Sequence, residues 1–195
     1  MKTLVLIAAV LIFTAGASFA EITGCLLIVE RASPELPTMQ IAEYAKSVVP
    51  GANHSIYQAG SNRFFIVCDK YIHHSDIFNQ STPRLWDLTS WFPCRCSSLP
   101  IADEFTAIWF LCPEEQDFKG FLDGCTNAYP GAMVLAINSK EQANGDMAVV
   151  LIQRGQDAKP HSTVPFKVLG TNELKRISSN KVPEDNDLKF SDPQH

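Results

Sequence analysis

The strongest constraint on the fold is a pattern that occurs twice. Residues 26–52 and 106–132 share one outline: an apolar stretch, a stretch of helical period and a Pro-Gly pair, at Pro50-Gly51 and at Pro130-Gly131. Two further apolar stretches follow each pair. Because Pro and Gly end helices and short apolar runs suit strands, each copy predicts a strand, a helix and two more strands. Identities between the copies are few, so both duplication and two ordinary α/β units stay open.

We therefore predict an α+β fold in which duplicated β-α-β-β units form a mainly antiparallel sheet with helices on one side. The units are expected at about 22–68 and 105–153 within a single domain of residues 21–170. Residues 69–104 form an insertion between them. Residues 171–195 carry both charges and few large apolar side chains, which predicts a disordered polar tail.

The helix boundaries follow from capping signals. Ser33-Pro34-Glu35 and Pro113-Glu114-Glu115 place proline and acidic residues where a first helical turn favours them. In the insertion, Thr82-Pro83 precedes four apolar residues at helical spacing, which predicts a further short helix; they are Leu85, Leu88, Trp91 and Phe92. An edge strand is expected at 163–169.

The first twenty residues have the pattern of a signal peptide. Lys2 precedes an apolar run from Leu4 to Phe13, and Ala17-Ser18-Phe19-Ala20 resembles a cleavage site. The run is shorter than the roughly 20 residues of a membrane span, and no later stretch reaches that length. We expect cleavage after Ala20 and a soluble chain that is secreted or enters the lumen of the secretory pathway.

Charge limits the partners. The formal net charge is −5 and no basic face is apparent, which argues against nucleic acid and anionic membranes. A small apolar ligand or an extracellular protein remains as the expected partner.

Six cysteines remain after the signal peptide, and in an oxidising compartment an even number predicts disulfides. If the first and third strands of a unit are antiparallel neighbours, Cys25 lies beside Cys68. A helix starting at Pro113 would hold Cys112 and Cys125 about 20 Å apart, too far for a mutual bond. Each is then expected to reach the loop that holds Cys94 and Cys96.

Two glycosylation sequons agree with this route: Asn53-His54-Ser55 and Asn79-Gln80-Ser81. No catalytic or metal motif is specific. Cys94-x-Cys96 has neither redox nor zinc spacing, and His73-His74-Ser75-Asp76 is more simply a solvated loop than a metal site. No Gly-x-Ser-x-Gly elbow is present. We predict no enzyme and assign no catalytic residue, no metal ligand and no defined cofactor.

Three acidic residues near the second helix, Glu114, Glu115 and Asp117, resemble a paired-carboxylate site but are better explained as charges that complement the helix dipole. Gly120 and Gly124 allow a close backbone approach on that helix, although a thin solvent-facing side is the simpler interpretation.

The aromatic residues of the insertion are the candidates for ligand contact, and ordinary core packing is the simpler alternative. They are Trp86, Trp91 and Phe92.

Two tandem β-α-β-β units resemble the superfamily of gyrase-inhibitory-protein-like effector-binding domains and SOUL haem-binding proteins. The resemblance covers roughly residues 22–154 and depends on element order and on the helix–Pro–strand passages at 50–57 and 130–137. It implies a groove between the units and an amphiphilic ligand, and no family site residue matches a position here.

Three hypotheses follow. The leading one is a secreted, non-enzymatic binding protein with a groove for a small apolar or amphiphilic ligand, with haem and lipid as candidates. The second is a secreted protein-interaction module without a small-molecule pocket. The third is a hydrolase or thiol enzyme, which needs a free thiolate or an unrecognised triad.

Overall fold

The structure is a computed structural model that describes residues 22–78, 86–96, 98–137, 145–163 and 166–180. The expected signal peptide, the sequon at Asn79 and the tail beyond residue 180 lie outside these ranges. No helix in the described part has the length and apolar character needed to cross a membrane.

Two segments of the chain have the same strand order. The first contains β1 (Gly24–Arg31), α1 (Gln40–Val48), β2 (His54–Ala59) and β3 (Arg63–Cys68), paired in the antiparallel order β1-β3-β2. The second contains β5 (Glu104–Leu111), α3 (Phe118–Ala128), β6 (Met133–Ile137) and β7 (Met147–Gln153), in the order β5-β7-β6. The element order predicted from the two Pro-Gly passages is therefore present in both.

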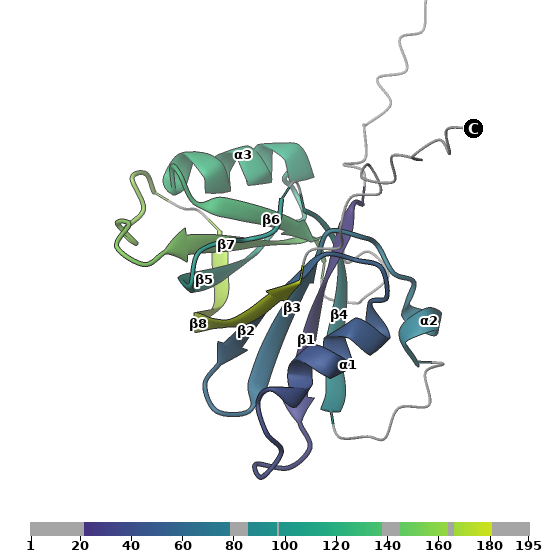
Figure 1. The fold of residues 1–195 in the computed structure, drawn as a ribbon. Helices are drawn as coiled ribbons and strands as arrows, with labels where there is room; N and C mark the ends of the chain where they lie inside the picture. The colour runs from purple at the N-terminus through teal and green to yellow at the C-terminus, as the bar shows by residue number, and fades with distance from the viewer. Residues whose placement is uncertain (1–21, 79–85, 97, 138–144, 164–165, 181–195) are drawn as a thin grey trace, which may run out of the picture.

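The predicted fold class is nevertheless wrong, because the sheet closes. Strand β4 (Trp86–Arg95) joins β1 to β6, and β8 (Lys167–Asn180) joins β2 to β5. The result is a closed eight-stranded barrel in the order β1-β3-β2-β8-β5-β7-β6-β4. Helices α1 and α3 lie outside the two halves of this barrel, and the five-residue α2 (His74–Phe78) lies beside β4 (Figure 1).

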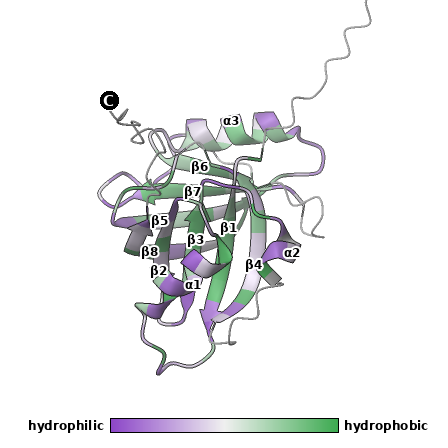
Figure 2. Ribbon diagram, turned by 45° about the vertical axis from the view of Figure 1, so that its right-hand side comes forward, coloured by the Kyte–Doolittle hydropathy of each residue, from purple (hydrophilic) through white to green (hydrophobic). Residues whose placement is uncertain are grey.

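Burial divides the apolar residues into three layers. One cluster fills the barrel, a second lies between α1 and the outer face of β1, β2 and β3, and a third lies between α3 and the outer face of β5 and β7. The alternation of inward and outward side chains along each strand supplies both the interior and the outer layers. Figure 2 shows hydrophobic residues along the strands and hydrophilic patches on the two helices.

Both long helices begin later than predicted. Helix α1 starts at Gln40 because Pro37 interrupts the first expected turn: residues before a proline disfavour the helical region. Helix α3 starts at Phe118, where the Asp117 carboxylate accepts a 2.8 Å hydrogen bond from the amide of Gly120. The predicted ends are correct, since α1 stops at Val48 and α3 at Ala128, each two residues before its proline.

The predicted helix of the insertion is a strand with a bulge. Val29 pairs with Leu88 and Ile28 with Ser90, so Thr89 is left without a register partner. This extra residue keeps Leu88 and Trp91 on the same outer face. Their spacing of three residues imitates a helical period.

The predicted polar tail is also wrong over residues 171–180, which belong to β8. The expected edge strand at 163–169 is instead the start of this 14-residue strand from residue 167 onward. Within the described ranges no helix covers its outer face, which agrees with its polar composition; Lys167, Thr171, Glu173 and Lys175 are all exposed there.

Candidate functional site

The barrel interior is filled by side chains. Tyr57 lies 5.6 Å from Phe105 between ring centroids, and Trp109 lies 6.0 Å from Phe65 and 5.9 Å from Phe92. The other large residues of this cluster are also buried: Leu26, Val67, Leu135, Met147, Val149, Leu151 and Leu174. The groove that the family resemblance implies between the two units is therefore occupied by the protein's own core.

The aromatic candidates from the insertion do not form one site. Trp86 and Trp91 belong to the outer layer beneath α1, whereas Phe92 points into the barrel. Trp86 packs edge-on against Phe64 at 5.2 Å, and the Trp91 indole donates a 3.1 Å hydrogen bond to the carbonyl of Ile72. All three residues contribute to packing layers on opposite faces of β4.

Clefts gather on the outer face of β8 and its neighbours. Four shallow clefts of about 260 to 410 Å³ each include Glu104, Glu173 or both among their lining residues. Their walls come from β5, β8, β7 and the residues after it, the end of β2 with its turn to β3, and Glu30 of β1. We call this region the β8 face and define it by its polar side chains: Gln58, Glu104, Thr106, Arg154, Glu173 and Lys175.

Charges alternate across the strands of the β8 face. Arg154 forms an ion pair with Glu104, and Lys175 is the register partner of both Glu104 and Gln58. One row therefore reads Arg154, Glu104, Lys175, Gln58 from β7 to β2. Opposite charges directly across a sheet stabilise it by about 0.2–1 kcal/mol per pair, so this row contributes to strand register as well as to surface charge.

The second row of the β8 face centres on Glu173. The hydroxyl of Thr106 donates to both carboxylate oxygens of Glu173, at 3.0 and 3.1 Å. Among the described residues, no cation forms an ion pair with this carboxylate. Glu173 thus presents an exposed negative charge at the point where three of the four clefts meet.

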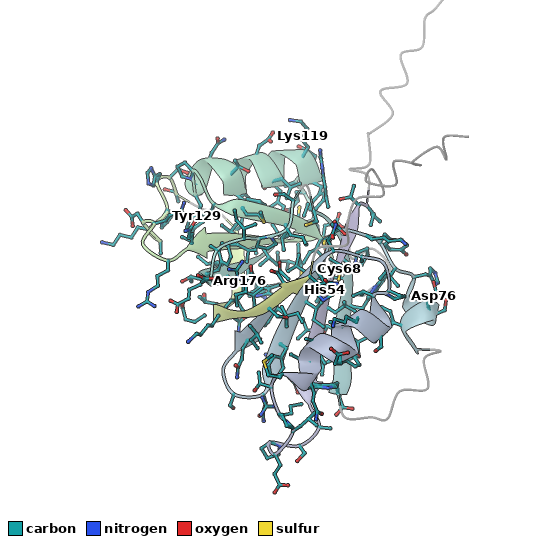
Figure 3. All side chains as sticks on the ribbon, viewed as in Figure 1. His54, Cys68, Asp76, Lys119, Tyr129 and Arg176 are labelled. Carbon is teal, nitrogen blue, oxygen red and sulfur yellow. The ribbon has the colours of Figure 1, made fainter. Side chains whose placement is uncertain are left out.

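The six cysteines are all described and all free, so the disulfide bonds predicted from their even number are wrong. The predicted neighbourhood of Cys25 and Cys68 is correct, because they are register partners on β1 and β3. Burial raises the pKa of the Cys68 thiol, and the adjacent Cys25 thiol raises it further. Figure 3 shows this region, where Cys68 lies next to His54 of β2.

The expected contacts of Cys112 and Cys125 with the Cys94-Cys96 loop are also wrong. Cys94 and Cys96 lie in the barrel core, whereas Cys112 packs against the layer beneath α3 that contains Cys125. Helix α3 begins only at Phe118, so Cys112 lies before the helix rather than at its first turn, and it packs against the same layer as Cys125. Burial, together with the smaller effect of the neighbouring Cys112 thiol, raises the pKa of Cys125 to about 12.

The sequon at Asn53 is tied into the fold. Its backbone and side-chain amides donate to the Asp69 carboxylate at 3.0 and 2.6 Å. Ser55 is buried, and its hydroxyl donates to the carbonyl of Pro100 at 3.1 Å. Use of this sequon stays a prediction, as it does for Asn79 outside the described ranges.

The remaining candidates do not assemble into a site. The Nδ1 atom of His73 lies 2.8 Å from the Ser75 hydroxyl, and the described residues hold no cluster of three or more metal-ligating side chains. Asp117 caps α3. Gly124 approaches Phe166, the residue before β8, because a Cβ atom placed on it would lie 2.7 Å from Cζ of Phe166.

Sequence reasoning missed the β8 face because its residues come from four separate segments of the chain. The one local signal is Leu174, an apolar residue between the charged Glu173 and Lys175, which fits a strand with one solvent-facing side. No protein-family model, curated protein or solved structure matches the chain. The protein is a closed antiparallel β-barrel with a filled interior and with helices α1 and α3 packed outside it.

Proposed function

We propose that the chain is a secreted, non-enzymatic recognition protein that binds another protein through the β8 face. The observation that carries this proposal is the contrast between a packed barrel interior and a group of polar clefts on the outer face of β8 and its neighbours, which neither α1 nor α3 covers. Of the two binding hypotheses drawn from the sequence, this geometry favours the interaction module.

The chemistry of the β8 face suits a protein partner better than haem or lipid. The clefts are lined mainly by charged and amide side chains, and they are open and shallow. Ligands such as haem bind in enclosed, mostly apolar pockets. Alternating charges around an exposed carboxylate give the electrostatic complementarity that selects protein partners and accelerates their association.

The same geometry gives little support to the thiol-enzyme hypothesis. Five of the six cysteines are buried. Burial raises the pKa of Cys96 to about 11 and that of Cys125 to about 12, so their thiolate fractions are small at neutral pH.

Position-dependent photo-crosslinking tests the proposal. The photoreactive amino acid p-benzoylphenylalanine replaces Lys175 on the β8 face in one variant and Lys119 on α3 in a control; both lysines are exposed. Each purified chain is irradiated in the extracellular fluid of its source and analysed by mass spectrometry. We expect one protein to crosslink in stoichiometric yield from position 175 and not from position 119.

Native mass spectrometry of the untreated chain provides the second arm. A small molecule retained by the chain, together with equal or absent crosslinking from the two positions, would overturn protein recognition and restore the apolar-ligand hypothesis.

A further inference from the structure

Strand β8 has one edge that is only partly paired. Strand β5 pairs with β8 from Lys167 to Lys175, whereas β2, on the other edge, pairs only from Lys175 to Asn180. Within the described residues, no strand pairs with the β2-side edge between Lys167 and Leu174. Backbone groups of a strand point alternately to its two edges, so this stretch presents donors and acceptors that another strand can use.

A bulge limits the usable length of this edge. Trp109 pairs with Gly170 and Phe110 with Val168, which leaves Leu169 as the extra residue. The regular part of the free edge is therefore Gly170–Leu174. Beyond it, Val168 and Leu169 are 53% and 45% exposed, and they place apolar surface at the end of the edge.

The cleft of about 410 Å³ lies along this same edge. It is bounded by Thr171, Asn172 and Glu173 on β8 and by the turn at 59–63 together with Glu30 on the other side. Gly60 in that turn has a φ of 68°, as a tight reversal between β2 and β3 requires. The free edge thus faces a cleft rather than another packed element.

The charges around the cleft specify one kind of side chain. Glu30 is neutralised by Arg63 at 2.7 Å, and Glu104 by Arg154. Glu173 accepts hydrogen bonds from the Thr106 hydroxyl, and no described cation is within ion-pair distance of it. A Lys or Arg from a bound segment would find its carboxylate partner here.

We propose that an extended segment of the partner protein adds to β8 as a further strand along Gly170–Leu174 and places a Lys or Arg side chain against Glu173. Main-chain hydrogen bonds provide the attraction in this binding mode, and side chains that enter neighbouring clefts provide the selectivity. The inference rests on the proposed function, because it names the form of the partner and its contact on the β8 face.

The test begins with a phage-displayed library of linear twelve-residue peptides, selected on the full chain. The most enriched peptide is synthesised, and its affinity is measured by fluorescence polarisation. We expect a Lys or Arg that is required for binding. Residue-resolved hydrogen exchange by NMR should show that the peptide protects alternate amides within Gly170–Leu174.

Charge variants give the quantitative arm. Glu173→Lys should weaken peptide binding at least about tenfold, because it removes a charge-assisted hydrogen bond. Glu173→Gln should weaken binding less. Glu115→Lys makes the same change of net charge at an exposed residue of the loop before α3 and should leave the affinity unchanged. A peptide whose basic residue is replaced by Glu should recover affinity for Glu173→Lys.

The outcomes separate this inference from the proposed function. Protection at another surface, equal loss in Glu173→Lys and Glu115→Lys, or no enriched peptide would each overturn strand addition. If crosslinking from position 175 still captures one protein, recognition by the β8 face stands with a folded partner surface as the contact. If crosslinking from position 175 also fails, both proposals fall.

Discussion

Replacing Gly124 by alanine sets two effects of opposite sign against each other. Gly124 lies inside α3, and alanine in a helix interior is about 0.8–1.0 kcal/mol more favourable than glycine. On that ground alone, Gly124→Ala would stabilise the protein. The obstacle is Phe166, whose Cζ and Cε2 atoms lie 2.7 and 3.0 Å from the position of the new methyl group.

Phe166 cannot move away cheaply. It is buried, and its ring meets Phe121 edge-on at 4.7 Å and Phe110 at 6.5 Å. Forcing an extra methyl group into such a layer costs about 1–3 kcal/mol. The net expectation for Gly124→Ala is a loss of about 1 kcal/mol in the free energy of unfolding.

A double-mutant cycle separates the gain in helix propensity from the steric cost at Phe166. Phe166→Leu removes the Cζ and Cε2 atoms, so in that background Gly124→Ala should stabilise the chain by up to about 1 kcal/mol. The free energy of unfolding of all four proteins is measured by urea denaturation. Gly120→Ala is the matched control, because its nearest neighbour is the Asp117 carboxylate, and it should show no coupling to Phe166→Leu. If Gly124→Ala stabilises the wild-type chain as much as it stabilises Phe166→Leu, the steric argument is refuted.

Three further predictions follow from the core. Ser55 and Tyr57 both donate to the carbonyl of Pro100, at 3.1 and 2.8 Å, so Ser55→Ala and Tyr57→Phe should each cost about 1 kcal/mol, and the pair more than their sum. Urea denaturation should find this excess, and simple additivity would contradict the shared acceptor. Burial raises the pKa of Tyr57 to about 12, so its contribution is complete below pH 10 and is lost between about pH 10 and 12. The free energy of unfolding, measured across that pH range, should fall with rising pH, and Tyr57→Phe should reduce this slope. Equal slopes in the two proteins would contradict a buried phenol. Cys112 is the one cysteine that is not fully buried, so iodoacetamide should label it first and all six after denaturation. Fewer than six thiols in the denatured chain, counted by mass spectrometry, would mean that disulfides form.

The local pattern was sufficient to predict the elements of each unit. Pro50 and Pro130 mark the ends of both long helices, and the apolar runs after them are the strands β2, β3, β6 and β7. These features depend on interactions a few residues apart, such as the loss of a helical hydrogen bond at proline. Even the neighbourhood of Cys25 and Cys68 followed from the order of strands within one unit.

Features that depend on distant contacts were not predictable in the same way. The bulge at Thr89 places Leu88 and Trp91 on one face of a strand, and in sequence the same spacing indicates a helix. The strand is selected over the helix by two contacts with distant parts of the chain: backbone pairing with β1 and side-chain packing beneath α1.

By itself the sequence determined two similar β-α-β-β segments and the boundaries set by proline and glycine. Only the tertiary structure decided that β4 and β8 close these segments into one barrel, that side chains fill the interior, and that the β8 face remains open. The physical reason is that β8 gains its stability from backbone pairing with β2 and β5. Amino-acid composition indicates which segments are buried because they are apolar. The side chains of β8 can be polar because backbone hydrogen bonds to β2 and β5, which lie far away in the sequence, hold this strand in place.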